Sequence, residues 1–215
     1  MTGGSGSTRM EVPSWEYPSR PASTEDAAVE GGEWTAYQSG VELFEVETGE
    51  YQETLQKIKD WDILDLAYSP GGKLILVSSF EAVEAWQISN GKVNQVPCPQ
   101  AGITFSPSGE NAALACDPDG EEPYQMLWNP RSGEVTYLSG APYIEFRKLR
   151  FSADGKLVMG LSSTKRVSIW DGESGEYLSS LPETDEGALD VHFIAGGRMI
   201  AVLDSTGRLQ LFGVK

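Results

Sequence analysis

Short apolar segments separated by glycine-containing turns follow one another along most of this chain. Leu74-Ile75-Leu76-Val77 and Met199-Ile200-Ala201-Val202-Leu203 are typical, because they are aliphatic at consecutive positions and bounded by polar residues. Runs of about four to eight such residues between turns predict strands that are covered on both faces. The pattern therefore predicts an all-β fold.

An aromatic residue recurs at a constant spacing. Phe44, Trp86, Trp128, Trp170 and Phe212 each end a short strand-like run, and neighbours in this series are 42 residues apart, four times in succession. Self-similarity at a period of about 20 to 50 residues is the sequence signature of repeat folds. The chain is therefore expected to repeat one small unit.

Two kinds of turn divide each unit into strands. An aromatic residue followed by a tight turn recurs at Tyr68, Phe105, Phe151 and Phe193, and a glycine closes the turn that follows each of the first four aromatic runs, at Gly49, Gly91, Gly133 and Gly175. Glycine supplies the positive φ that such turns need. The marks predict four strands per unit, with strand a near 63–68, b near 73–79, c near 82–88 and d near 92–97.

A single four-stranded sheet cannot bury both of its faces, whereas radial stacking of such sheets in a propeller does so. We therefore predict a β-propeller of four-stranded antiparallel blades, about five in number, the first and last being incomplete. Complete blades are expected over 62–97, 100–140 and 146–181. The last begins near Ala188 and lacks a fourth strand, and the first keeps only strands b, c and d, at 34–38, 41–46 and 51–56. A five-bladed ring, a piece of a larger ring and half of a dimer all fit.

The repeat resembles that of the WD-repeat family. The resemblance rests on the period, on the turn Phe105-Ser106-Pro107-Ser108-Gly109 and on Val167-Ser168-Ile169-Trp170-Asp171, and it covers about residues 34 to 215. It implies a scaffold that docks proteins or peptides on its rim and top face. The Gly-His dipeptide of the family is absent, and His192 is the only histidine, so the family's buried His–Asp–Ser/Thr–Trp network cannot form in the usual way. Modest stability is expected as a result.

The first 33 residues differ from the repeats in composition. They are rich in Gly, Ser, Pro and Glu and show no periodicity, which predicts disorder. Within them, residues 11–17 carry two aromatics and could add a closing strand beside residues 208–214, or could remain part of a loose tail.

The charge balance narrows the classes of partner. Sixteen basic against 32 acidic residues give a net charge of −16 and a sequence pI near 4.4. This field repels nucleic acid and anionic membrane surfaces, and it either attracts basic partners or simply keeps the protein soluble. No apolar run approaches the ~20 residues of a membrane helix. Cys98 and Cys116 form neither a disulfide framework nor a zinc-ligand spacing, so free thiols and a cytoplasmic location are expected.

Catalytic signatures are largely missing. Nucleophilic triads need a histidine to move a proton, and the single His192 lies inside a predicted strand. There is no phosphate-binding glycine loop, and no cofactor or metal is predicted. The acidic run Asp117–Glu122 departs from the calcium-loop pattern, and we interpret it as a solvated hairpin tip or a partner contact.

The candidate binding residues lie in loops that a propeller would gather on one face. Loops d–a and b–c share that face, which would be acidic with aromatic anchors, as interface hot spots often are. Alternatively, the aromatic residues merely cap the loops. Asp65 and Asp190 share a register in strand a, where they could hold water, a cation or a partner's basic side chain. The complete candidate set is Asp60, Trp61, Asp62, Asp65, Phe80, Asp117, Asp119, Glu121, Glu122, Tyr124, Tyr143 and Asp190.

Three functions are consistent with these features. The first is a non-catalytic protein-protein interaction scaffold that binds a basic partner segment on the acidic face. The second is a fragment or domain of a larger WD-repeat sensor or signalling protein. The third is a propeller enzyme such as a metal-dependent hydrolase, which would need carboxylates to converge in the channel. An unclosed ring would in addition favour self-association.

Overall fold

The computed structural model describes residues 39–44, 48–58, 63–88, 90–142, 145–182 and 187–213. The chain divides into two units, Met1–Thr35 and Ala36–Lys215, and all described residues belong to the second. The predictions for residues 1–33, including the closing strand at 11–17, lie outside the described residues. Among the described residues, no helix has the length and apolar character needed to cross a membrane.

The described strands form five antiparallel sheets, which we label A to E in chain order. Sheet A contains β1 (Ser39–Phe44) and β2 (Tyr51–Ile58). Sheet B contains β3 (Asp65–Tyr68), β4 (Leu74–Ser78), β5 (Ala82–Gln87) and β6 (Gly91–Pro97). Sheet C contains β7 (Gly102–Phe105), β8 (Ala112–Cys116), β9 (Tyr124–Trp128) and β10 (Val135–Tyr137). Sheet D contains β11 (Phe146–Phe151), β12 (Leu157–Ser162), β13 (Val167–Asp171) and β14 (Tyr177–Ser180). Sheet E contains β15 (Ala188–Ile194), β16 (Met199–Asp204) and β17 (Leu209–Gly213), with a 3-10 turn η1 (Ala195–Gly197) between β15 and β16.

Within each sheet the strands lie in chain order and pair with their sequence neighbours. This confirms the all-β prediction and the four predicted strands of the first complete unit, whose observed ends differ by one or two residues. Sheet E has three strands, as expected for the last unit. The strands expected at 41–46 and 51–56 correspond to β1 and β2, and the strand expected at 34–38 lies outside the described residues.

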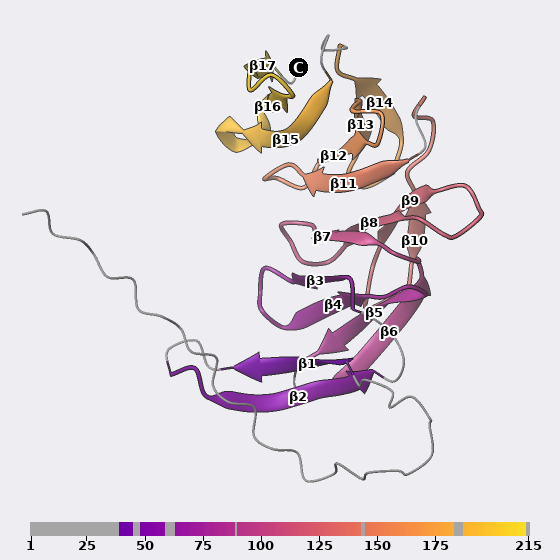
Figure 1. The fold of residues 1–215 in the computed structure, drawn as a ribbon, viewed down its shortest axis with the longest axis vertical. Coiled ribbons are helices and arrows are strands. Elements are labelled where there is room, and N and C mark those ends of the chain that lie inside the picture. The colour runs from indigo at the N-terminus through magenta and orange to yellow at the C-terminus, as the bar shows by residue number, and fades with distance from the viewer. Residues whose placement is uncertain are drawn as a thin grey trace, which may run out of the picture. The chain divides into compact units, whose positions relative to one another are not determined.

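Consecutive sheets B to E pack face to face (Figure 1). Leu76 of sheet B shares a buried cluster with Trp128 of sheet C. Leu127 of sheet C shares the next cluster with Trp170 of sheet D, and Ile169 of sheet D packs in a third cluster with Val202 of sheet E. We call the face that a sheet turns toward the next sheet its forward face, and the opposite face its backward face.

The recurring aromatic residue lies on the backward face. Trp128, Trp170 and Phe212 each pack in the cluster that their sheet shares with the preceding sheet. The 42-residue spacing seen in the sequence therefore marks one repeated contact between neighbouring sheets. A buried aromatic side chain contributes about 1.5–3 kcal/mol through the apolar area it removes from water, so this contact is a principal source of stability.

The structure corrects the prediction of free thiols. Cys98, directly after β6, and Cys116, at the end of β8, form a disulfide with an S–S distance of 1.99 Å, and both are buried between sheets B and C. The prediction was wrong because the two residues are 18 positions apart and belong to different sheets, so only the stacking of these sheets brings them together. The cytoplasmic location rested on free thiols and loses that support.

Candidate functional site

Three loops meet at one end of sheets B and C. We call them the acidic loop cluster: residues 79–81, 98–101 and 117–123. The backbone N–H of Gln100 donates to the carbonyl of Ser79 (3.0 Å), and the N–H of Asp117 donates to the carbonyl of Pro99 (3.0 Å). The segment that joins sheets B and C, residues 98–101, is thus hydrogen-bonded both to the β4–β5 loop of sheet B and to the β8–β9 loop of sheet C. With the Cys98–Cys116 disulfide beneath it, the cluster has a fixed base.

Gln100 holds the centre of the cluster in an unusual backbone conformation. Its φ is 50°, a left-handed value that costs a residue with a side chain roughly 1–2 kcal/mol. Its side-chain Nε2 donates to Oδ1 of Asp119 (3.0 Å). Strained backbone of this kind tends to occur at functional sites, where the surrounding structure holds it in place. Gln100 therefore aligns the acidic loop with the sheet connection.

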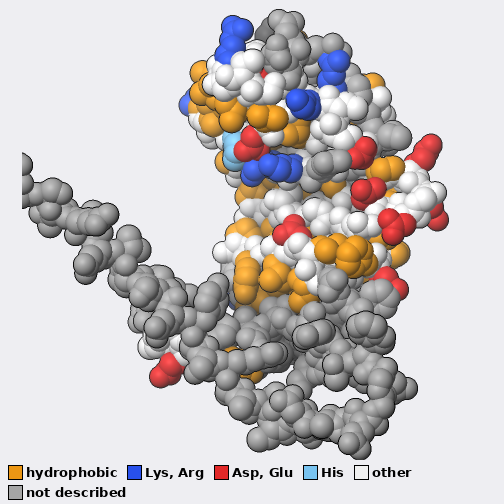
Figure 2. Space-filling model, in the orientation of Figure 1, with side chains coloured by type: hydrophobic (Ala, Val, Ile, Leu, Met, Phe, Trp, Pro, Cys, Tyr) orange, Lys and Arg blue, Asp and Glu red, His pale blue; other side chains and the backbone are white. Residues whose placement is uncertain are grey.

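The loop that joins β8 and β9 carries the negative charge. Asp117, Asp119, Glu121 and Glu122 are all exposed on it, and Gly120 at its tip has a φ of 79°. Figure 2 shows acidic side chains gathered over the part of the surface where this loop projects. Because these carboxylates are exposed to water, their field is available to a partner.

Aromatic side chains flank the acidic loop. Phe80, in the loop between β4 and β5, is 45% exposed. The Tyr124 hydroxyl donates to the carbonyl of Pro97 (2.9 Å), and its ring meets the edge of Tyr137 at a centroid distance of 6.1 Å. Burial raises the pKa of the Tyr124 hydroxyl above its ordinary value, with further increases from Tyr137 and Glu121, so this hydroxyl stays protonated as a donor at neutral pH.

The structure places the predicted site residues in two different regions. Six of them belong to the acidic loop cluster or its edge: Phe80, Asp117, Asp119, Glu121, Glu122 and Tyr124. Asp65 and Asp190 lie instead on the first strands of sheets B and E, β3 and β15. The remaining four, Asp60, Trp61, Asp62 and Tyr143, lie outside the described residues. Sequence reasoning missed Gln100 and Tyr137, because neither the strained φ nor the aromatic contact leaves a mark in the repeat pattern.

Asp65 is engaged within the chain. One carboxylate oxygen accepts a hydrogen bond from the backbone N–H of Ile103 in the next sheet (3.2 Å), and the other accepts from the N–H of Leu66 (2.8 Å). Asp65 therefore joins sheet B to sheet C.

Asp190 has several basic neighbours. Its carboxylate lies 3.6 Å from Nζ of Lys148, 3.6 Å from Nη2 of Arg150 and 3.1 Å from Nε2 of His192. Burial alone would raise the pKa of Asp190, but hydrogen bonds from His192 and the Val191 N–H, together with the Lys148 charge, lower it below its ordinary value. Of the occupants considered for Asp190, which were water, a cation and a partner's basic side chain, the structure shows basic side chains of sheets D and E of the chain itself.

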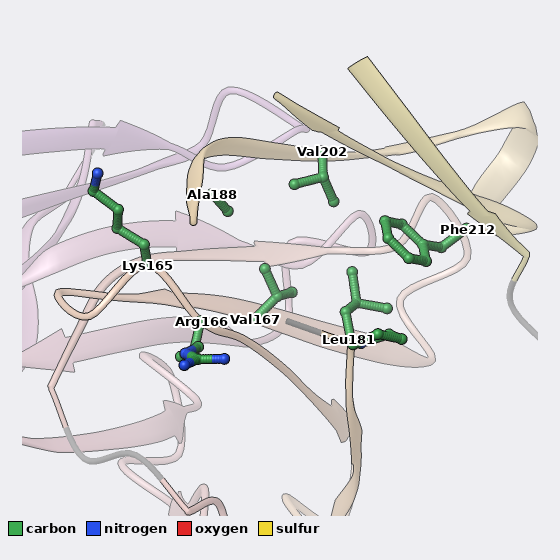
Figure 3. Close-up of a pocket in the computed structure, with 8 residues that line it drawn as sticks. Lys165, Arg166, Val167, Leu181, Ala188, Val202 and Phe212 are labelled. Carbon is green, nitrogen blue, oxygen red and sulfur yellow. The ribbon is translucent and has the colours of Figure 1, made fainter. Parts of the chain in front are cut away.

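Two cavities are found in the described part of the structure. One of about 310 Å³ is lined by residues of the first strands of sheets C, D and E and of the turns that follow them, including Arg150, Ser152 and His192. The other lies between sheets D and E, where Val167, Leu181, Val202 and Phe212 converge (Figure 3). Its volume of about 10 Å³ is at the lower limit for a single water molecule, so it is a packing crevice rather than a ligand site. Within the described ranges, no three His, Cys, Asp or Glu side chains are grouped to hold a metal.

Comparisons with known proteins bear on the fold alone. No protein-family model matches the sequence, and no curated protein matches it. Among solved structures, 1160 chains match, one of them in the crystal structure of the computationally designed Ika4 protein. The likeness to Ika4 has a TM-score of 0.58 at 15% sequence identity and covers 73% of this chain and 93% of Ika4. Since one fold hosts many functions, function must be argued from the site.

Proposed function

We propose that this protein is a non-catalytic interaction scaffold, built as a β-propeller of the WD-repeat kind, that binds a basic segment of a partner protein at its acidic loop cluster. Its propeller character is supported by the face-to-face packing of successive sheets, each with its strands in chain order. The 42-residue recurrence of the backward-face aromatic supports the WD-repeat kinship.

The observation that carries the function is the display of four exposed carboxylates on an anchored loop beside an exposed phenylalanine. Carboxylates recognise Arg and Lys through charge-assisted hydrogen bonds, which are about twice as strong as neutral ones. The base of the loop is fixed by Gln100 and the disulfide, so less conformational entropy is lost on binding.

Phe80 supplies the apolar part of the same surface. An exposed aromatic ring beside carboxylates can accept the stem and the guanidinium of an arginine, a cation–π contact of about 0.5–2 kcal/mol. Aromatic residues within charged rims are common binding hot spots. The preferred ligand is therefore an Arg-containing peptide segment rather than a Lys-only one.

The test is calorimetric titration of an Arg-rich peptide into the full chain at low ionic strength. The site variant is Glu121→Lys with Glu122→Lys. The matched control is Glu173→Lys with Glu176→Lys, because these exposed residues lie in the turn between β13 and β14 and the change in net charge is the same. We expect the site variant to lose about tenfold or more in affinity, equivalent to about 1.4 kcal/mol, and the control to lose about twofold. Equal losses, or no binding by the unmodified protein, would contradict the proposal.

Phe80→Ala tests the aromatic part separately. Removing the ring should weaken binding of the Arg-rich peptide by about tenfold and should weaken binding of a Lys-only peptide less, because the cation–π contact favours guanidinium. Leu178→Ala, on the outer strand β14 and similarly exposed, is the control and should leave both affinities unchanged.

The structure bears differently on the two other candidate functions, a propeller enzyme and a part of a larger WD-repeat protein. A propeller enzyme would need carboxylates that are free to act around the inner strands, but Asp65 is bonded to Ile103 and Asp190 is paired with basic side chains. We do not propose it. The alternative function, as a fragment or domain of a larger WD-repeat sensor or signalling protein, is favoured by the exposed leucines of sheet E, Leu203, Leu209 and Leu211.

A further inference from the structure

The cavity of about 310 Å³ beside the first strands of sheets C, D and E has polar side chains at one repeated position. Thr104, Arg150 and His192 line it, one from each sheet. Each of the three directly precedes the aromatic residue that begins the turn between the first and second strands of its sheet. The repeat therefore brings three polar residues, at equivalent places in three successive sheets, to the wall of one cavity.

The strands that carry these residues are fixed by the aromatic residues that follow them. Phe105, Phe151 and Phe193 pack against the three buried clusters that join sheets B to C, C to D and D to E. Successive residues of a strand point to opposite sides, so packing of each phenylalanine also sets the side on which the polar residue before it projects. The polar groups are thus in place before a ligand arrives, which limits the entropy lost on binding.

Positive charge exceeds negative charge beside the cavity. Lys148 lies two positions before Arg150 on β11, and so on the same side of that strand. Both side chains approach a single carboxylate, with nitrogen atoms 3.6 Å from Oδ1 of Asp190. With His192 neutral, the group has one net positive charge, although the whole chain has a net charge of −16. Figure 2 shows Lys and Arg side chains gathered over the part of the surface formed by sheets D and E.

Arg150 keeps hydrogen-bond donors available. The distance of 3.6 Å between its Nη2 and Asp190 is too long for a hydrogen bond, and its Nε has no hydrogen-bond partner among the described residues. The side chain is 37% exposed, so a dissolved anion can reach the guanidinium. A planar guanidinium binds a carboxylate through two parallel N–H···O bonds. Arg150 is therefore the group that would hold an anion at this cavity.

The size and the charge of the site favour a small carboxylate. A volume of about 310 Å³ is at the lower end of the range of small-molecule pockets. A carboxylate has a single negative charge, which equals the net charge beside the cavity, whereas the Asp190 carboxylate would oppose a doubly charged phosphate. Residues 146–215 contain nine Lys or Arg and nine Asp or Glu, while residues 1–145 contain seven against 23. The part of the chain that supplies the basic groups therefore has no excess of negative charge to repel an anion.

We infer that this cavity binds a small organic carboxylate, whose charged group pairs with Arg150 while the rest of the molecule lies beside Thr104 and His192. Asp190 acts as a positioning residue, because Lys148, Arg150 and His192 all approach its carboxylate. The site shares no residue with the acidic loop cluster and prefers the opposite charge. It does not depend on the proposed function.

The test is titration of benzoate into the full chain at constant pH and ionic strength, followed by proton NMR of the histidine ring. His192 is the only histidine, so its ring signals report on this cavity. We expect a saturable shift with benzoate, and at least tenfold weaker binding of benzamide, which has the same ring without the charge. No saturable shift with benzoate, or equal affinity for benzamide, would overturn the inference.

Arg150→Gln removes the charge that holds the ligand and should weaken benzoate binding at least tenfold. The matched control is Arg131→Gln, at an exposed arginine in the turn between β9 and β10, which should change the affinity less than twofold. Equal losses would mean that only the overall charge matters and would overturn the inference. Thermal unfolding followed by circular dichroism shows whether Arg150→Gln is folded. If it is not, Arg150→Lys keeps the charge but loses the planar fork and should weaken binding about threefold, and an unchanged affinity would contradict the assignment.

Asp190→Asn should change the affinity in the opposite direction. It removes the carboxylate that competes with the ligand for Arg150, so benzoate should bind at least threefold more tightly, whereas damage to the site would weaken binding. A loss of affinity in a folded Asp190→Asn protein would therefore contradict the assignment.

Two further probes test the chemical class and the source of the carboxylate. Phenyl phosphate should bind the wild-type protein more weakly than benzoate, because Asp190 opposes its second charge. A short peptide with a free C-terminal carboxylate should bind at least tenfold more weakly than benzoate, because the cavity has room for a small molecule only. Tighter binding of phenyl phosphate or of the peptide would overturn the inference of a small carboxylate.

Discussion

Sheets D and E carry the same contact surface in two different states. Ile169 in β13 and Leu211 in β17 hold equivalent places, each paired with the strand b residue of its own forward face. Ile169 is buried under sheet E, whereas Leu211 is more than half exposed. The residues are alike, but sheet D has a fourth strand and a following sheet, and sheet E has neither among the described residues. An apolar sheet face in this fold therefore indicates a packing surface, and the face is buried only where another sheet packs on it.

The largest effect should come from placing a charge at these two positions. Ile169→Asp puts an unpaired carboxylate between sheets D and E, which should cost about 4 kcal/mol or more of the free energy of unfolding. Leu211→Asp faces water in the monomer and should change it by about 0.5 kcal/mol or less. Urea unfolding in dilute solution measures both. Similar losses for the two variants would show that the face of sheet E is covered within the monomer.

The disulfide should rank next, because it strengthens the contact between sheets B and C only. Cys98 and Cys116 are 18 residues apart, and a loop of this length contributes about 3 kcal/mol through the entropy of the unfolded chain. Adding a reductant should therefore lower the unfolding temperature of the wild-type protein. The Cys98→Ala, Cys116→Ala double variant should be less stable from the start and should not respond to the reductant. An unchanged wild-type unfolding temperature would mean that the cross-link does not contribute.

A substitution of Gly160, on the backward face of sheet D, should have a smaller effect on stability than loss of the disulfide. It occupies the register of Val202 in sheet E, but a Cβ at Gly160 would meet Phe146 at 2.7 Å and Trp170 at 2.9 Å. The glycine makes room for the Phe146 ring, which lies edge-on to Trp170 with 4.9 Å between centroids. Gly160→Ala should overpack this contact and cost about 1–3 kcal/mol. Thermal unfolding measures the loss, and Gly71→Ala, where a Cβ meets nothing within 4 Å, is the control.

The smallest effect on stability is expected from the carboxylates that close the turns, because their hydrogen bonds are made within the turn and do not depend on a neighbouring sheet. Hydrogen bonds from the backbone N–H groups of Ser174 and Glu173 hold the pKa of Asp171 below its ordinary value. A carboxylate whose pKa is lower in the folded state stabilises the protein at neutral pH, and this contribution is lost as the pH falls through the ordinary and then the folded pKa. Asp171→Asn should therefore lose less stability than the wild-type protein between pH 7 and pH 3.

Asp204 closes the turn between β16 and β17 in the same way. Its pKa is lowered chiefly by the hydroxyl of Thr206, with help from the N–H groups of Arg208 and Thr206. Asp204→Asn should flatten the acid limb of the stability profile as Asp171→Asn does, whether or not sheet E has a neighbour. Urea unfolding at a series of pH values is the measurement, and Glu173→Gln removes one charge from the Asp171 turn as a control. A steeper acid limb in either Asn variant would contradict this assignment.

Much of the fold could be predicted from the sequence because its signals are local. The 42-residue recurrence of Trp86, Trp128 and Trp170, together with the glycine-closed turns, predicts the strands and their order. The gathering of Phe80 with the acidic loop follows from the same strand order. These features depend on residues near one another in the chain.

Contacts between sheets were harder to predict, because they join residues that no period relates. The Cys98–Cys116 bond, the ion pairs from Lys148 and Arg150 to Asp190, and the left-handed Gln100 all arise where two sheets meet. The shared register of Lys148 and Asp190 is visible in the sequence. Whether the Lys148 side chain reaches Asp190 depends on how closely sheets D and E pack, and the sequence does not show that distance.

The central claim is that the forward faces of sheets D and E differ because sheet D has a following sheet and sheet E has none among the described residues. Amide hydrogen exchange of β12 and β16 tests it most directly, because both strands pair with a neighbour on each side within their own sheets. The amides of Leu157–Ser162 should be protected more strongly than those of Met199–Asp204, because sheets pack on both faces of β12 and on one face of β16. Equal protection of the two segments would contradict the claim.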